Sequence, residues 1–336
     1  MYTLLQQRQP MYPQIRRNGV TEPLGVFYLE QWQSDQERLV TLTGQCGLGL
    51  LDKTIFYGGM YQEKPVTELL AEIAACGGLG YELDESLAAA TVTGWLPLGS
   101  PRQALQQLAF AIGAVADCSR SETLRLYPLP QTSQYTIELA RQQEGQRLTL
   151  LPLVTGVEVT AHQYRANDRE SQLFSGELPL GRQEITFSQP AHTVSINSAG
   201  RFLEIGANYA VIEVTKAGTV TINGKGYDDN TQVFRYTMPQ LPAGEKEHVV
   251  QVSDATLVHS GNGAAVAQRL YEARQQRCQG EATFQVAEEK PGDRVTLACR
   301  YQQALCGTVT RLETDVTGGM LGKAVIGGGL ANAHNG

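Results

Sequence analysis

The 336-residue sequence predicts a mainly β protein of the α+β class. From residue 147 onward, alternating and β-branched apolar runs recur about every ten residues between turn residues, which is typical of a sandwich or barrel. Apolar residues at helical spacing occur at three places, and two of these lie close together in the first half of the chain. Hydrophobic residues make up 42% of the chain, enough for a core, and about 150 residues per domain gives two or three domains.

The first regular element is a predicted β-hairpin. Residues 25–30 and 38–44 alternate between apolar and polar side chains, and the polar residues 33–36 are expected to form the turn. Residues 47–53 predict a short apolar turn or helix. The residues before 20 are expected to form an irregular, Pro-containing N-terminal segment without a clear strand partner.

Residues 61–129 predict a compact module with the order α-β-β-α-β-β. Pro65 opens the first helix and Gly77-Gly78 ends it, while Ser100-Pro101-Arg102-Gln103 forms a capping box that opens the second. Because the module begins and ends in turns marked by Gly or Pro, we expect it to be an insertion. Its strands are predicted at residues 81–83, 91–96, 115–116 and 123–127.

The rest of the chain is predicted to be almost all strand, interrupted by one helix over residues 264–277. The tail, residues 329–336, is expected to be flexible. The predicted strands are residues 148–153, 156–163, 184–187, 192–196, 202–205, 209–215, 219–222, 233–237, 281–287, 294–298, 307–315 and 321–326.

The charge balance argues against a nucleic-acid binder. Lys and Arg number 27 against 34 Asp and Glu, a net charge of −7, whereas phosphate recognition relies on clustered positive charge. No run of 18 apolar residues could span a membrane, and the first ten residues do not resemble a signal peptide. Charged residues amount to 18%, below the usual ~25%, so much of the polar surface is uncharged and suited to lasting subunit contacts.

The six cysteines are scattered, and no two have the spacing of a zinc or redox motif. A chain of this length does not need disulfides, so we expect free, mostly buried thiols in a reducing compartment. These cysteines are Cys46, Cys76, Cys118, Cys278, Cys299 and Cys306.

Histidines and glycine-rich segments offer no catalytic pattern. The histidines, His162, His192, His248, His259 and His334, lie far apart in the sequence. None is paired by a motif with a nucleophile or a second ligand, and Gly-x-Ser-x-Gly is absent. The glycine-rich residues 44–49, 77–80 and 318–322 lack the features of a phosphate loop, so we interpret them as turns.

The acidic clusters do not indicate a metal or catalytic site either. Asp228-Asp229-Asn230 could seat a cation, but a polar hairpin turn accounts for the same residues. Glu288-Glu289, and the pair Glu82 and Asp84, lack the apolar setting that a glycosidase acid needs. The sequence therefore predicts a protein that is not an enzyme, with no catalytic, cofactor-binding or metal-binding residues and no cofactor.

Specific blocks resemble tail hub or baseplate hub proteins of long-tailed phages and of prophage-derived tail-like particles. Residues 25–35 with 38–53 resemble the opening hairpin and turn of these proteins, and the likeness continues through residues 56–61. Overall it covers residues 20–328, and residues 61–129 also resemble the small α/β domains that precede the pore in secretins. The strongest blocks are residues 94–111, 207–211, and 288–295 with 307–319.

The hub resemblance implies two hub-type β-barrels in each chain, with two inserted domains. Residues 20–60 plus 130–150 would form the first barrel, carrying the α/β module at 61–129. Residues 150–164 plus 245–328 would form the second, carrying a β-rich insertion at 165–240. The leading strand of the family is weak or missing here, and no lysozyme-like or peptidase sequence follows the barrels.

The same resemblance implies a homotrimer whose barrels form a pseudo-sixfold ring in the virion tail, assembled in the cytoplasm of the bacterial host. Expected partners are tail tube and distal tail proteins, a tip or spike protein and the tape-measure protein, but no specific nucleic-acid sequence. An acidic ring would suit a DNA path, because a negative lumen does not trap phosphate.

The alternative is a host-surface glycan- or receptor-binding tail protein that acts through residues 165–240. Aromatic side chains suit such binding, although core packing explains most of them. The aromatic residues in question are Tyr164, Phe174, Phe187, Phe202, Tyr209 and Tyr227.

Overall fold

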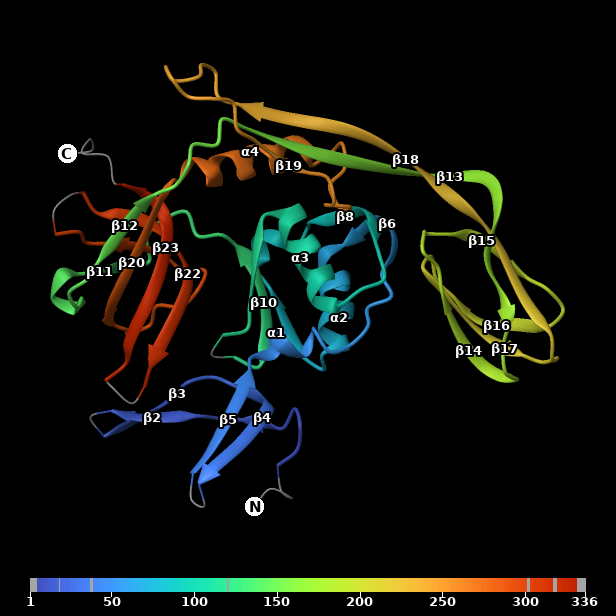
Figure 1. Ribbon diagram of the computed structural model, residues 1–336, viewed down its shortest axis with the longest axis horizontal. Coiled ribbons are helices and arrows are strands. Elements are labelled where there is room, and N and C mark those ends of the chain that lie inside the picture. Colours follow the sequence, from blue (N-terminus) through green and yellow to red (C-terminus); the bar gives the residue numbers. More distant parts are fainter. Residues whose placement is uncertain are drawn as a thin grey trace.

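The computed structural model describes residues 5–17, 19–36, 39–119, 121–300, 303–316 and 319–330. The protein is mainly β, as predicted, and the α/β module lies at its centre (Figure 1). The N-terminal hairpins lie below the module in this view, the C-terminal sheet lies on the left, and a long ribbon crosses the top to a distal unit on the right.

The N-terminal region consists of two small sheets. Strands β4 (Phe27–Gln36) and β5 (Leu39–Gln45) form the predicted hairpin, but residues 33–36 belong to β4, and the two residues between the strands lie outside the described residues. The N-terminal segment is not irregular, contrary to what the sequence had indicated. Strand β1 (Pro10–Met11) pairs with β4, and β2 (Gln14–Arg17) pairs with β3 (Val20–Pro23). These strands carry mostly exposed side chains, so they show little of the alternation that marks a half-buried strand.

The central module has the predicted order α-β-β-α-β-β, but it begins with a further strand, β6, which the sequence pattern did not predict. After the short helix α1 (Gly47–Leu50), Ser100 and Gln103 form the predicted capping box of α3, and Gly113 ends that helix with a left-handed φ of 75°. Leu69 and Leu70 of α2 pack against Leu105 and Leu108 of α3 in one core. The elements are β6 (Gly59–Pro65), α2 (Val66–Cys76), β7 (Gly80–Leu83), a 3₁₀ turn (Glu85–Leu87), β8 (Thr91–Leu96), α3 (Pro101–Ile112), β9 (Ala114–Asp117) and β10 (Thr123–Pro128).

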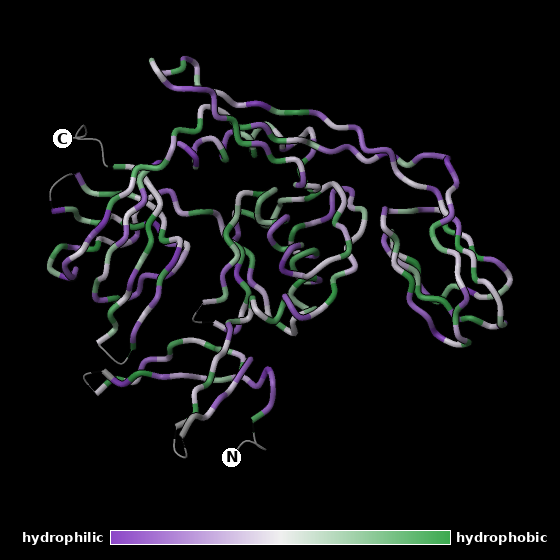
Figure 2. Tube along the Cα trace, in the orientation of Figure 1, coloured by the Kyte–Doolittle hydropathy of each residue, from purple (hydrophilic) through white to green (hydrophobic). Residues whose placement is uncertain are grey.

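Two long strands form a ribbon that the sequence pattern did not predict. Strands β13 (Gly156–Glu177) and β18 (Thr219–Thr237) pair antiparallel along almost their full length. Their middle residues are polar on both faces, so they give no period-two signal, and Figure 2 shows this hydrophilic stretch. At the near end, β19 (Val249–Val252) pairs parallel with β13, and helix α4 (Gly263–Gln275) packs against the ribbon.

The distal unit at the far end of the ribbon is β-rich, as expected for residues 165–240. Strands β14 (Gly181–Thr186), β17 (Tyr209–Val214) and β16 (Gly200–Ile205) form one sheet, and β15 (His192–Ile196) extends the ribbon. Side chains of this sheet pack against the ribbon ends around a separate core. The buried members of this core are Ile185, Phe187, Ala191, Ala199, Ala210, Ile212, Val214, Val220 and Ile222.

The C-terminal sheet has six strands in the order β11-β21-β22-β23-β20-β12. One face buries a core around Phe284 to which every strand except β12 contributes a buried residue, while Leu148 of β12 packs on its margin. The strands are β11 (Tyr135–Ile137), β12 (Arg147–Leu150), β20 (Cys278–Gln285), β21 (Arg294–Leu297), β22 (Leu305–Asp315) and β23 (Leu321–Leu330), and a 3₁₀ turn (Leu139–Arg141) lies between β11 and β12.

Strand pairing here differs from the predicted grouping of residues 130–150 with residues 20–60. Strand β11 pairs parallel with β21, and β12 pairs antiparallel with β20, so both belong to the C-terminal sheet. Local alternation indicates a strand but not its partner, which explains the difference. No sheet among the described residues closes into a barrel. Residues 329–330 end β23 and are not part of a flexible tail, whereas residues 331–336 lie outside the described residues.

Candidate assembly junctions and surfaces

The histidines make structural contacts. His162 is buried, with Nδ1 2.7 Å from Asp229 Oδ2 and Nε2 3.1 Å from the carbonyl oxygen of Ser253. His192 Nε2 lies 3.1 Å from the carbonyl oxygens of Asn167 and Gly226, so this ring bridges the two ribbon strands. His248 Nδ1 lies 2.9 Å from the Leu153 carbonyl oxygen and His259 Nδ1 accepts the Gly261 amide at 3.1 Å, while His334 lies outside the described residues.

The acidic residues singled out by sequence also make structural ties. Glu289 is fully buried, pairs with Arg141 at 2.7 Å and accepts the amide of Ala287 at 2.8 Å. Asp228 pairs with the exposed Arg169, and Asp84 caps the 3₁₀ turn that follows it. Across the described part of the chain, no three His, Cys, Asp or Glu side chains gather in a way that could hold a metal ion. Glu289 therefore ties separate elements together, whereas Asp84 and Asp228 make a local cap and an exposed ion pair.

An ion-pair cluster joins the module to the C-terminal sheet. Asp117, at the end of β9, is buried and lies 2.7 Å from Lys290 Nζ and 3.1 Å from Arg125 Nη2. Lys290 belongs to the turn that precedes β21, and it lies over the ring of Tyr127. Residues 290–293 form a tight turn, because Asp293 accepts the Lys290 amide and Gly292 has a φ of 94°.

Electrostatics in this cluster follow from burial and close charges. Burial alone would raise the pKa of Asp117, but hydrogen bonds from Lys290 and Ser119 outweigh it and hold the pKa below its usual range. Burial raises the pKa of Asp293, and it raises that of Tyr127 to about 12 with help from Asp117. Asp117 is thus the ionised centre of the junction.

A second junction ties the distal unit back to the module. Asn208, in the turn before β17, is buried and donates Nδ2 to the carbonyl oxygens of Tyr57 at 2.7 Å and Leu96 at 2.8 Å. Its Oδ1 accepts the indole N–H of Trp95 at 2.8 Å. The ring of Tyr209 lies 4.3 Å from that of Tyr57. One asparagine therefore uses both ends of its amide to hold the far unit against β8.

Strand β8 also contacts the segment that follows β19, residues 253–262. Thr256 donates its hydroxyl to the carbonyl oxygen of Trp95. Gly94 beside it has a φ of 143°, and a Cβ on Gly94 would lie 2.3 Å from the Thr256 oxygen. Glycine is required at this close approach. Strand β8 is therefore where the module, the distal unit and the 253–262 segment meet.

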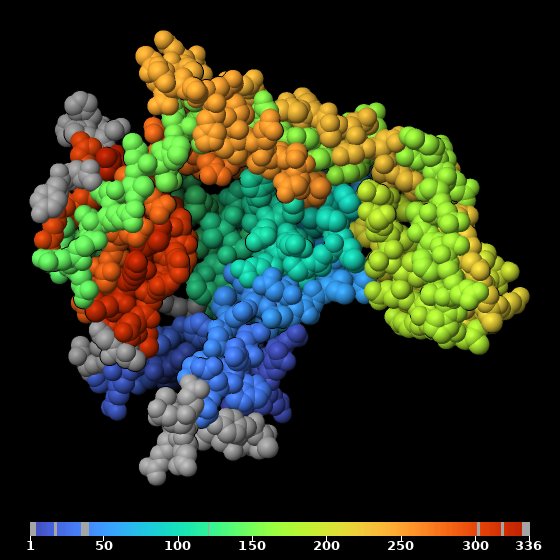
Figure 3. Space-filling model, viewed as in Figure 1, coloured from blue at the N-terminus to red at the C-terminus, as the bar shows by residue number. Residues whose placement is uncertain are grey.

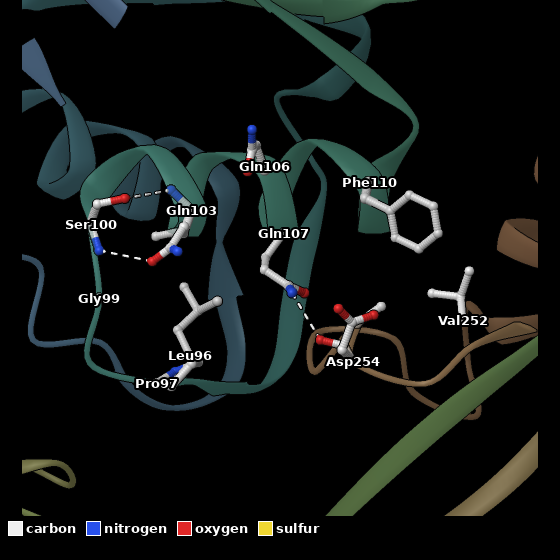
Figure 4. A pocket seen from close by; sticks show the side chains of 12 residues that line it. Leu96, Pro97, Gly99, Ser100, Gln103, Gln106, Gln107, Phe110, Val252 and Asp254 are labelled. Carbon is white, nitrogen blue, oxygen red and sulfur yellow. Dashed lines mark hydrogen bonds between the residues drawn. The ribbon is translucent and has the colours of Figure 1, made fainter. Parts of the chain in front are cut away.

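A hollow of about 550 Å³ lies between α3 and the segment after β19 (Figure 4). Gln107 Nε2 donates to the Asp254 carbonyl oxygen at 2.8 Å, and Phe110 and Val252 line one side. Asp254 is the one ionisable side chain in the lining, so the hollow lacks a nucleophile with an adjacent base. Its chemistry suits docking of polar or apolar side chains.

The outer surface carries apolar side chains on exposed strands and loops. Leu150 of β12 is 69% exposed, Leu180 before β14 is 64% exposed, and Val20 of β3 is 60% exposed. In the N-terminal sheets, Val26 and Leu29 are the buried hydrophobic side chains among the described residues. Two-stranded hairpins with so little core are marginally stable alone, so these strands are candidates for subunit contact.

No protein-family model and no curated protein sequence matches the chain. Solved structures do match. A 43 kDa tail protein of prophage MuSo2 from Shewanella oneidensis aligns with a TM-score of 0.54 and 11% identity over 96% of this chain and 84% of its own. A tail protein from Neisseria meningitidis aligns with a TM-score of 0.55 and 10% identity over 92% of this chain and 82% of its own. Prophage tail protein gp18 from Listeria monocytogenes aligns with a TM-score of 0.52 and 10% identity over 90% of this chain and 76% of its own.

The chain has the fold of prophage tail proteins. The likeness spans nearly all of it, including the insertions, and it agrees with the family that the quoted sequence blocks resembled. Sequence reasoning missed the roles of Asn208 and Trp95, although both lie in quoted blocks. It also missed Asp117, whose partner Lys290 is far away in the sequence. Lone polar residues that satisfy distant backbone groups leave no local pattern.

Within the described ranges, none of the helices has the length and apolar character that crossing a bilayer requires.

Proposed function

We propose that the chain is a non-enzymatic structural hub at the distal end of a phage tail or tail-like particle. The observation that carries the proposal is the likeness to three tail proteins, two of them from prophages, over 90% or more of the chain. The residues support it chemically, because buried His162 and Glu289 hold elements together and the hollow beside α3 lacks a nucleophile with an adjacent base.

In this proposal the chain forms a homotrimeric ring that joins the tail tube to the tip or spike. The open C-terminal sheet and the N-terminal sheets would face neighbouring copies, and such contacts would cover their exposed apolar side chains. Residues 61–129 and 165–240 would be inserted modules that set the spacing between ring subunits. Tail tube, distal tail, tip and tape-measure proteins are the proposed partners, in a virion assembled in the host cytoplasm.

Light scattering on the purified chain tests the oligomer. We expect a mass three times the 36.6 kDa of one chain, and a ring in particle images. Mixing with the tail tube protein of the same prophage should give a capped tube. A chain that stays monomeric at high concentration and never associates with tube or tip proteins would refute the proposal.

The net charge of −7 adds a proposal about the ring lumen. Acidic side chains facing the lumen would keep DNA phosphates from binding during passage. An image of the assembled ring tests this, and acids gathered on the outer rim would contradict it.

The alternative function, binding of a host-surface glycan or receptor through residues 165–240, has one observation in its favour. A hollow of about 530 Å³ lies where this unit leaves the module, lined in part by Tyr61, Tyr164 and Tyr227. Against it, Phe174, Phe187 and Phe202 pack in the distal core, and Tyr209 hydrogen bonds Glu204. A glycan array with the wild-type chain and Tyr164→Ala decides: binding that Tyr164→Ala removes supports this alternative, and no binding leaves the hub.

A further inference from the structure

Two cysteines far apart in the sequence lie side by side where the N-terminal sheets meet the module. Cys46 follows β5 and forms the N-cap of α1, and Cys118 directly follows β9. The Cys118 sulfur accepts the Leu48 amide at 3.1 Å and would lie 3.5 Å from a Cβ on Gly47. Both contacts are with the residues that immediately follow Cys46, so the two thiols are neighbours.

The two thiols differ in exposure and ionisation. Cys118 is 1% exposed, whereas Cys46 is partly exposed. A hydrogen bond from the Cys118 thiol lowers the pKa of Cys46 to about 6 against the effect of burial, with help from the Leu48 and Gly49 amides and from Arg102. The same hydrogen bond, together with burial, raises the pKa of Cys118. An accessible thiolate beside a protected thiol is the arrangement of a reactive cysteine and its resolving partner.

We propose that Cys46 and Cys118 are a redox site whose disulfide fastens the N-terminal sheets to the central module. The oxidant is a small disulfide such as oxidised glutathione. The Cys46 thiolate attacks one sulfur of the oxidant, forming a mixed disulfide and releasing glutathione thiolate, which takes up a proton. Cys118 then loses its proton, attacks the Cys46 sulfur and releases the second glutathione. Two protein thiols are thereby oxidised and one oxidised glutathione is reduced to two thiols.

The bond would strengthen a weakly held part of the fold. The N-terminal sheets bury little apolar surface of their own, and the Lys53–Glu30 pair at 3.2 Å is partly solvent-exposed, so screening leaves it weak. Under the proposed function, on which this setting rests, the thiols stay reduced in the host cytoplasm and oxidise after the particle leaves the cell. The chemistry itself concerns the isolated chain and does not depend on the tail role.

The experiment equilibrates the folded full-length chain with oxidised and reduced glutathione, blocks free thiols and maps the peptides by mass spectrometry. We expect one dominant cross-link, Cys46 to Cys118. Cys46→Ser should abolish it, and the matched control Cys76→Ser should not, because the Cys76 thiol contacts the Glu72 carbonyl oxygen on α2 instead. A glutathione adduct on Cys46 with Cys118 still free, a bond only between other cysteines such as Cys278 and Cys299, or no oxidation at all would overturn the proposal.

The rate of thiol alkylation gives a second test that uses the wild-type chain alone. It therefore does not require a variant of the buried Cys118 that folds. In the reduced wild-type chain at pH 7, iodoacetamide should modify Cys46 about five-fold faster than Cys76, because more of Cys46 is thiolate although a less basic thiolate is less nucleophilic. Oxidised chain should show slower amide exchange in residues 39–50 than reduced chain. Equal alkylation rates, or exchange unchanged by oxidation, would contradict the assignment.

Discussion

Single buried polar side chains hold the units of this chain together. Asn208 satisfies two carbonyl groups and one indole N–H between the distal unit and β8, and Asp117 gathers two cations between the module and the C-terminal sheet. Removing one partner from such a site leaves buried groups unsatisfied, which costs more than the net value of the bonds. These residues therefore determine how the units sit relative to one another.

Replacing Asn208 should loosen the distal unit. Asn208→Ala leaves the Tyr57 and Leu96 carbonyl groups and the Trp95 N–H without a partner, and should destabilise the junction by about 3 kcal/mol. Asn208→Asp can still accept from Trp95 but turns a carboxylate toward two carbonyl oxygens, so it should be no better at neutral pH. Small-angle scattering and limited proteolysis of the ribbon measure the release.

The control for Asn208 is Asn197→Ala, which removes a more exposed asparagine of the same unit that bonds backbone groups within it. That variant should leave the scattering profile unchanged. An Asn208→Ala profile identical to wild type would show that other contacts hold the unit.

The Asp117 cluster should make the junction acid-sensitive. The pKa of Asp117 is lower in the folded chain than its usual value of 3.8, so its stabilising effect is fully present above about pH 4 and is lost as pH falls through the folded pKa. Stability of the wild-type chain should therefore fall more steeply than that of Asp117→Asn below pH 4, by at most about 1.4 kcal/mol per pH unit. Chemical denaturation at a series of pH values measures both slopes.

The partner of Asp117 gives a second check on this prediction. Lys290→Met leaves the buried carboxylate with Arg125 and Ser119 but without the closer of its two cations, and should cost about 2 kcal/mol at pH 7. In the double variant with Asp117→Asn most of that cost should disappear, since no charge remains to be paired. Additive effects would mean that the two side chains do not interact.

At the scale of elements, the hairpins and the ribbon are regular strands with little core of their own. Strand β3 is exposed along its whole length, and the middle of the β13–β18 ribbon is polar on both faces. Hydrogen bonds alone stabilise an isolated two-stranded hairpin weakly in water. The β2–β3 hairpin is therefore expected to depend on contact with another subunit.

Hydrogen exchange tests the dependence of β2–β3 on assembly. Amides of residues 14–17 and 20–22 should exchange rapidly in the monomer at low concentration and at least ten-fold more slowly in the oligomer. The core strand β20 serves as the internal control, since its amides should be protected in both states. Equal exchange of the hairpin amides in both states would place the hairpin away from the subunit contact.

For the whole molecule, the sequence predicted the strand-rich class, the order of elements in the module and the family that the fold resembles. The capping box at Ser100 and the end of α2 at Gly77-Gly78 were found because they depend on neighbouring residues alone. The partners of β11 and β12, and the Lys290–Asp117 and Cys46–Cys118 contacts, depend on residues brought together from distant segments. One sequence holds no direct signal for those pairings.

The ribbon leads to the distal unit, which also lies against the module (Figure 3). Chain enters that unit beyond Ala166 and returns through Tyr227, and these two residues are cross-strand partners. The chain therefore enters and leaves the distal unit at adjacent positions. A domain of different sequence could replace this unit while β13 and β18 keep their pairing register up to Ala166 and Tyr227. A chain built this way can change what its distal unit presents without changing the fold of the rest.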